Sequence, residues 1–200
     1  MENPTQLFLN NDNVLSGSYI NFTNPTKMYV PGFLGSYQNS DSQDVKNAYL
    51  YTQDCNMILV DSSQLLPFLK RNIGLSYDAQ PIGVILAEFI DYLITKGLKL
   101  TDLELIGISL GGQAIGIAGA AIKTGKPAKI IVFCSHSYSY HVGVYAVYHP
   151  NAFPALNCTS YDEYANGLCN NNDLQYVGDQ VTASAQGNYY AKAGNEVYNP

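Results

Sequence analysis

Ser109 is the residue whose surroundings most clearly predict chemistry. It lies in the middle of GISLG at positions 107–111, between an apolar segment over Leu103–Gly107 and a run of small residues that continues to Ala121. A serine on a sharp turn from strand to helix needs glycine on both sides, because a Cβ there would clash with the neighbouring strand and helix. The pattern predicts a nucleophilic serine; the alternative is an ordinary glycine-rich strand-to-helix turn.

A nucleophilic serine needs a base within hydrogen-bond reach, and the base needs a group that orients it. His136 follows the predicted strand Lys129–Phe133, where a loop could carry it over Ser109, so it is the predicted base. His141 and His149 are interpreted as surface or capping residues. The negative charge on the reacting oxygen would be held by the N–H groups of Phe33 and Leu110, which form the predicted oxyanion hole.

The orienting acid is the difficulty in this interpretation. No Asp or Glu lies between Ser109 and His136, the interval in which serine hydrolases of this class carry it. Asp61, at the end of a neighbouring predicted strand, is a weak candidate, since an aspartate there more often holds a loop by hydrogen bonds. The other acidic candidates are Asp162, Glu163, Asp173 and Asp179. Without the acid, kcat falls by roughly four orders of magnitude in the best-studied case.

Alternating strands and helices are predicted to position these residues. Strands are expected over 27–30, 56–60, 103–107 and 129–133, with helices over 42–52, 81–96 and from the serine to about 123. This order predicts an α/β fold, with a mostly parallel, doubly wound sheet in a single domain over residues 1–200. Ligands of such sheets bind at the carboxyl ends of the strands.

The remaining segments give weaker signals. An edge strand is expected at Gln6–Asn10, and either a strand or an extended arm at Ser16–Thr23. A helical turn is expected at Gln64–Phe68, either helix or strand at Ser137–Tyr148, and short strands near 174–177 and 188–193.

The composition limits which binding partners and which cellular compartment are expected for the chain. A net charge of −6 argues against nucleic acid, and no apolar run is long enough to span a membrane. No pattern predicts a metal or cofactor. Cys158 and Cys169 lie in a polar, turn-rich segment that needs a cross-link to become ordered, so a disulfide is predicted between them. Cys55 and Cys134 are either buried thiols or a second bridge.

Two glycosylation sequons, at Asn21 and Asn157, fit an exported chain. Together with the predicted disulfide, they favour secretion.

The chain resembles the animal neutral lipase family, which includes pancreatic-type and insect lipases, phospholipases A1 and insect yolk proteins. The resemblance rests on KMYVPGFL at 27–34, CNMILVD at 55–61, IGISLGG at 106–112 and the segments 134–153 and 158–169. It implies an α/β-hydrolase-like fold and places His136 on the family's catalytic histidine. It also implies a lipid, small ester or other apolar ligand.

The chain departs from the family after the strand at 129–133. The family continues there into its catalytic aspartate, further strands and a lid, whereas this sequence passes almost directly to Cys134-Ser135-His136. Pro31, Ser62 and Ile108 also replace residues usual in the family.

The resemblance implies a shortened member in which the fold is truncated after this strand. Two hypotheses follow. One is a degenerate protein, inactive or weakly active, with a binding, storage or structural role. The other is a lidless serine carboxylester hydrolase. A sheet edge exposed by the truncation would favour a homo-oligomer.

Overall fold

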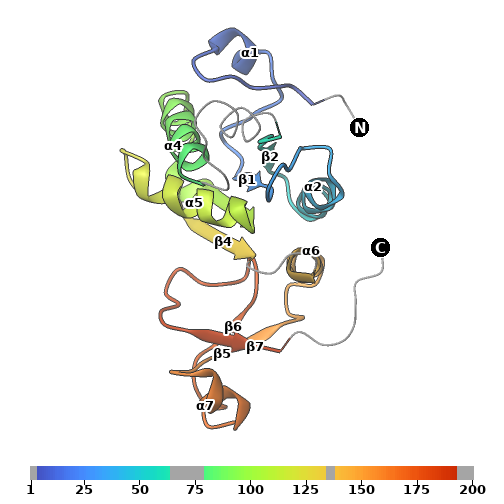
Figure 1. Cartoon of the computed structure of the whole chain (residues 1–200), viewed down its shortest axis with the longest axis vertical. Helices are drawn as coiled ribbons and strands as arrows, with labels where there is room; N and C mark the ends of the chain where they lie inside the picture. Colours follow the sequence, from blue (N-terminus) through green and yellow to red (C-terminus); the bar gives the residue numbers. More distant parts are fainter. Residues whose placement is uncertain (1–3, 64–78, 134–137, 193–200) are drawn as a thin grey trace. The chain divides into compact units, whose positions relative to one another are not determined.

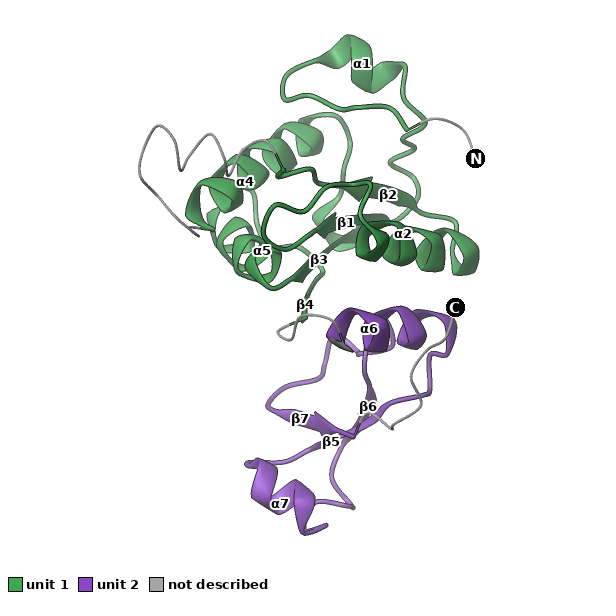
Figure 2. Cartoon of the chain, turned by 45° about the vertical axis from the view of Figure 1, so that its right-hand side comes forward, with its two compact units in different colours: residues 1–134 green, residues 135–200 purple. Residues whose placement is uncertain are grey.

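The structure is a computed structural model that describes residues 4–63, 79–133 and 138–192. The chain divides into two compact units, residues 1–134 and 135–200, which Figure 2 shows in different colours. The single domain expected over residues 1–200 stays a prediction. The helical turn expected at 64–68 lies outside the described residues.

The first unit contains a four-stranded, fully parallel sheet with the order β2-β1-β3-β4. Its strands are β1 (Thr26–Val30), β2 (Asn56–Leu59), β3 (Leu103–Ile108) and β4 (Lys129–Phe133). All four lie where the sequence predicts them, because each is a short apolar run of the kind that a sheet covered on both faces requires. The predicted α/β class with a parallel sheet is confirmed.

Helices cover both faces of this sheet. α4 (Gln80–Thr95) packs along α5 (Leu110–Ala121) on one face, and α2 (Ser40–Thr52) lies on the other (Figures 1 and 2). The chain moves from β1 to β2 in one direction and then returns past β1 to add β3 and β4. The direction of winding therefore reverses between β1 and β3, which is where open α/β sheets bind ligands.

The core of this unit lies between the sheet and the pair α4 and α5. α4 turns Leu86, Ile90 and Leu93 towards the core at helical spacing, and all three are buried. The two helices approach closely at Gly83, where a Cβ would stand 2.7 Å from the Ile117 side chain. The absence of a side chain at Gly83 therefore permits a tight helix pair.

The strand expected at Gln6–Asn10 is wrong. A short helix, α1 (Asp12–Ser16), follows instead, because Asn11 caps it by accepting a hydrogen bond from the Val14 N–H at 3.1 Å. A 3-10 turn, η1 (Leu100–Asp102), precedes β3. No strand forms over Ser16–Thr23. The buried Asn56 side chain ties this arm to β2 through hydrogen bonds to the Asn21 backbone.

The second unit contains a small antiparallel sheet with the order β6-β5-β7. Its elements are α6 (Tyr138–Tyr148), β5 (Pro154–Asn157), α7 (Tyr161–Ala165), β6 (Leu174–Tyr176) and β7 (Tyr189–Ala191). The segment left open between helix and strand is the helix α6. The strands expected near 174–177 and 188–193 are confirmed in shorter form, and the central strand β5 was not predicted.

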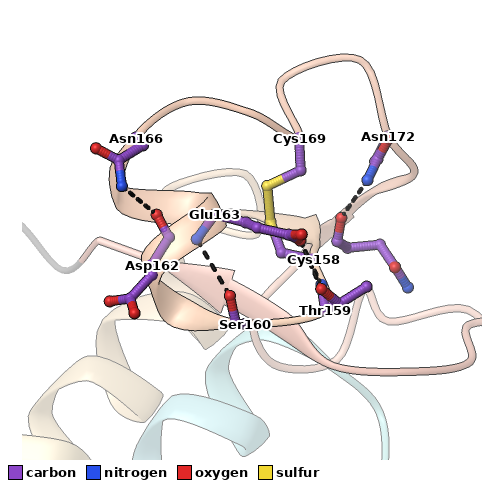
Figure 3. Close-up of a disulfide and its surroundings, with 9 residues drawn as sticks. Cys158, Thr159, Ser160, Asp162, Glu163, Asn166, Cys169 and Asn172 are labelled. Atoms are coloured by element: carbon purple, nitrogen blue, oxygen red, sulfur yellow. Dashed lines mark hydrogen bonds between the residues drawn. A yellow bond between two sulfur atoms is a disulfide. The ribbon is translucent and has the colours of Figure 1, made fainter.

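Cys158 and Cys169 form the predicted disulfide, with their Cα atoms 5.8 Å apart (Figure 3). It closes the loop that carries α7, where Ser160 caps the helix by accepting from the Glu163 N–H at 3.2 Å. Glu163 in turn accepts hydrogen bonds from the backbone and hydroxyl of Thr159. Cys55 is buried and Cys134 lies outside the described residues, so both alternatives for this pair stay open.

Replacing Cys158 and Cys169 together by serine is expected to destabilise the second unit by about 3 kcal/mol, because the bridge closes a loop with a sequence separation of 11. Hydrogen exchange of peptides from residues 154–191 during urea unfolding measures this loss. Reductant should lower the stability of the parent chain and leave the double variant unchanged. Equal midpoints for the two chains would contradict the prediction.

Asp173 links two strands of the second unit. Its carboxylate accepts hydrogen bonds from the Tyr189 hydroxyl at 2.5 Å and the Gln175 amide at 2.9 Å, and these lower the pKa of Asp173 below its usual value. A carboxyl whose pKa is lower in the folded chain binds its proton more readily when unfolded. Its contribution to stability is therefore complete above the unfolded pKa of about 4 and is lost as the pH falls through the folded value.

Asp173→Asn is consequently expected to flatten the acid dependence of this unit's stability below about pH 4. Urea midpoints measured between about pH 5 and pH 2 test this expectation. Parallel pH profiles for the parent chain and the variant would show that Asp173 does not contribute.

Candidate active site

Ser109 occupies a strained turn between β3 and α5. Its φ of 54° and ψ of −119° lie in a region that residues with side chains rarely adopt. A Cβ at Gly107 would stand 2.6 Å from the Gly111 carbonyl oxygen, and a Cβ at Gly111 would meet the carbonyl oxygen of Val30. Both glycines are therefore required by close backbone approach, as the sequence pattern predicts for a nucleophile elbow.

A tight loop after β1, residues 31–37, lies beside the serine; we call it the oxyanion loop. A Cβ built on Gly32 would be 3.5 Å from the Cβ of Ser109, so the backbone just before the Phe33 N–H borders the serine side chain. The Gly35 N–H donates to the Gly32 carbonyl oxygen at 3.0 Å, which closes a turn around Phe33 and Leu34. The structure thus brings this loop to the elbow, and the oxyanion role of the Phe33 and Leu110 amides stays a prediction.

Phe33 and Leu34 present apolar side chains at the tip of the oxyanion loop. Each is 45 % exposed, although both are large apolar residues. Leu110 by contrast is buried at the start of α5. The loop next to the strained serine therefore carries two exposed apolar side chains.

Asp61 follows β2 and hydrogen-bonds to its own neighbourhood. It accepts from the Ser63 N–H at 3.0 Å, from the Ser63 hydroxyl at 2.6 Å and from the Ser36 hydroxyl at 3.0 Å. Burial alone would raise the pKa of Asp61. The hydrogen bonds from Ser63, Ser36 and the Tyr37 N–H outweigh that effect, so the pKa of this carboxyl lies below its usual value and it is ionised at neutral pH.

Ser36 and Ser63 were missed as partners of this site. The signal for Ser63 was present in the sequence, because an aspartate followed by two serines often accepts hydrogen bonds from the second of them, whereas nothing local pointed to Ser36.

The predicted base, His136, lies outside the described residues, so its distance from Ser109 is not part of the described structure. His141 lies within α6, with its ring 4.0 Å from that of Tyr140, and His149 is exposed just after this helix. The assignment of His136 as base stays a prediction.

Two of the other acidic candidates accept hydrogen bonds from residues near them in the fold. Glu163 accepts from Thr159, and Asp173 accepts from Tyr189 and Gln175.

Within residues 4–63, 79–133 and 138–192, no three His, Cys, Asp or Glu side chains cluster as a metal site. Across the same residues, no helix is long and apolar enough to cross a membrane.

Both sequon asparagines are described. Asn21 is exposed, and its side-chain oxygen accepts hydrogen bonds from the N–H and hydroxyl of Thr23. Asn157 lies in β5, is partly buried, and donates from its amide nitrogen to the Gln186 carbonyl oxygen at 2.7 Å. Asn21 is therefore the more accessible acceptor for a glycan.

The parallel sheet, the strained serine and the adjacent loop define a chain of the α/β-hydrolase class. Comparison with known proteins identifies relatives. The chain is 30% identical over 146 residues to a phospholipase A1 of Vespa velutina, and the match covers 65% of this chain and 48% of that protein. It is equally identical to a probable phospholipase A1, magnifin, of Vespa magnifica, covering 65% of this chain and 43% of that protein.

Lipase member H of Oryctolagus cuniculus is 31% identical over 101 residues, covering 50% of this chain and 22% of that protein. No family model matches the chain. The chain spans about half the length of the phospholipases that it matches, and less of the lipases. These relatives confirm the resemblance: the chain is lipase-like and is related in sequence to the animal neutral lipases.

Proposed function

We propose that the chain is a secreted, lipase-like protein with a degenerate active site, which retains a serine nucleophile and acts weakly on apolar carboxylic esters. The observation that carries this proposal is the strained backbone of Ser109, held next to the oxyanion loop. Such a conformation is unfavourable and persists only where the surrounding structure imposes it. The relatives are named as phospholipases A1 and lipases, which supports a carboxylic ester as the substrate class.

The proposed reaction is acyl transfer through a covalent intermediate. The Ser109 hydroxyl attacks the ester carbonyl, and His136 takes the serine proton and passes it to the leaving alcohol. The N–H groups of Phe33 and Leu110 hold the oxyanion. Water then attacks the acyl-serine, His136 again accepts and returns the proton, and the carboxylic acid leaves.

Weak activity follows from the missing acid. Without an orienting carboxylate, kcat is lower by roughly four orders of magnitude, which corresponds to roughly 5 kcal/mol of transition-state stabilisation. Since ordinary enzymes turn over at about 1–1000 per second, we expect about 0.0001–0.1 per second here. Under this proposal, the chain binds apolar ligands and also hydrolyses esters slowly.

Turnover of a short-chain p-nitrophenyl ester by the parent chain, Ser109→Ala and His136→Ala tests this proposal. We expect slow hydrolysis that both substitutions abolish. Turnover in the ordinary enzymatic range would instead support the lidless hydrolase. Hydrolysis unchanged in Ser109→Ala would contradict any role of this serine.

A second candidate is an inert binding, storage or structural protein of the same fold. The observation that favours it is the absence of any Asp or Glu between Ser109 and His136. Under this candidate, the parent chain and Ser109→Ala hydrolyse esters at the same background rate.

Secretion is proposed from the disulfide and the two sequons. Expression through a secretory pathway should give a glycosylated product whose mass falls after enzymatic deglycosylation. Asn21→Gln should remove most of the shift, because Asn157 is partly buried. An unmodified secreted chain would contradict glycosylation.

A homo-oligomer is proposed from β4, which forms one end of the described four-stranded sheet and carries exposed Ile130 and Val132. Pairing with a second copy would satisfy the strand's outer backbone groups. Light scattering that shows a monomer at all concentrations would overturn this.

A further inference from the structure

The tip of the oxyanion loop is strained in a second place. Leu34 has a φ of 55°, in the left-handed region that favours glycine, yet it is a bulky and exposed residue. The turn from Gly32 to Gly35 is closed by one backbone hydrogen bond of 3.0 Å. Such a turn keeps its shape only if the chain that follows it is fixed.

The segment after this turn is held by residues that follow β2 and by the first turn of α2. The Ser62 N–H and hydroxyl both donate to the Gly35 carbonyl oxygen, at 3.2 and 3.3 Å. The Ser42 hydroxyl, from α2, donates to the Ser36 carbonyl oxygen at 2.9 Å. Asp61 adds a further contact, because its carboxylate accepts a hydrogen bond from the Ser36 hydroxyl at 3.0 Å. It is the only carboxylate among the described partners of Ser36.

Most of the acceptor capacity of Asp61 is taken up locally. An ionised carboxylate has about four lone-pair positions. Three hydrogen bonds reach the Asp61 carboxylate, from the Ser63 N–H, the Ser63 hydroxyl and the Ser36 hydroxyl. An imidazole N–H would have to compete with these donors before Asp61 could orient a histidine.

We infer that Asp61 is a positioning residue, which holds the oxyanion loop in the shape that keeps the Phe33 N–H beside Ser109, and that it does not orient the base. The inference rests on the proposed function, since a held oxyanion donor matters only if the serine reacts. Ser36 is the direct link, because its hydroxyl joins the loop to the carboxylate. Asp61 thus acts on the reaction through the loop backbone, without touching the substrate.

Asp61→Asn and Ser36→Ala test the inference, with Asp54→Asn as the matched control. Asp54 is exposed just before β2, whereas Asp61 follows it. The first readout is amide hydrogen exchange of the peptide that spans residues 32–38. We expect faster exchange in Asp61→Asn and Ser36→Ala and no change in Asp54→Asn. Unchanged exchange in both loop variants would overturn the inference, even if the serine proves inert.

The second readout is the rate at which a fluorophosphonate labels Ser109 as a function of pH. We expect Asp61→Asn and Ser36→Ala to slow labelling by about tenfold to a hundredfold, less than the roughly hundredfold to thousandfold cost of removing an oxyanion donor outright. The double variant should be no slower than the slower single variant, and the apparent pKa of the labelling profile should stay the same. A shift of that pKa in Asp61→Asn alone would show that Asp61 orients the base, and would overturn the inference.

Failure of this inference can be distinguished from failure of the proposed function. Absence of labelling in the parent chain contradicts the proposed function, whereas the exchange measurement decides independently whether Asp61 holds the loop.

Discussion

Replacing Glu104 by glutamine is expected to destabilise the first unit by about 3–5 kcal/mol, a large part of the total stability of an ordinary domain. Glu104 lies on β3 opposite Lys27 of β1, and the Lys27 ammonium is 2.6 Å from its carboxylate. The Lys27 side chain is only 4% exposed and that of Glu104 only 16%. The substitution therefore removes the charge that neutralises a buried ammonium, and urea unfolding at neutral pH measures the loss.

The neighbouring charges supply the controls. Lys129, on β4, stands 3.6 Å from the other oxygen of Glu104, so Lys27→Met leaves the carboxylate with a cation and should be less damaging than Glu104→Gln. Combining Lys27→Met with Glu104→Leu should recover much of the stability, because apolar replacement of a whole buried pair is often neutral. A double variant as unstable as Glu104→Gln would show that the pair is not the cause.

Gly111→Ala is expected to destabilise the first unit by about 3 kcal/mol and to abolish reaction at Ser109. The added Cβ would meet the backbone carbonyl oxygens of Val30 and Pro31, which cannot turn aside as a flexible side chain could. The start of α5 would have to move away from β1. That movement would separate the elbow from the oxyanion loop, and thermal unfolding together with fluorophosphonate labelling would detect both effects.

Gly116→Ala is the matched control in the same helix. A Cβ at Gly116 would meet no heavy atom within 4 Å. Alanine in an exposed helical position is more favourable than glycine by about 1 kcal/mol, so this variant should be more stable than the parent chain and react normally. Similar losses in the two variants would show that helix packing at Gly111 is not the cause.

The elements of the first unit were predictable because local sequence determines them. Four short apolar runs predicted the parallel strands, and the glycines at 107 and 111 predicted the elbow that the structure contains. The expected strand at Gln6–Asn10 was wrong because the chain turns at Leu9 and Asn10 and a capping asparagine then begins a helix. Alternation of apolar residues over five positions is too short a signal to outweigh such a cap.

Contacts between distant segments were not predictable. The ion pair of Lys27 with Glu104 depends on strand order and register, neither of which the sequence specifies. The partnership of Asp61 with Ser36 likewise depends on a loop that returns to the end of another strand. The sequence identified Asp61 as either an acid or a loop anchor, and its described hydrogen bonds are those of an anchor.

Labelling with a fluorophosphonate, followed by the mass of the intact chain, tests the central claim most directly. The reagent requires an activated serine but does not require completed turnover, so it detects a nucleophile even where hydrolysis is slow. We predict one phosphonyl group per chain, located on Ser109, and none in Ser109→Ala. A folded parent chain that gains no phosphonyl group after prolonged exposure would contradict the claim that this elbow still carries a reactive serine.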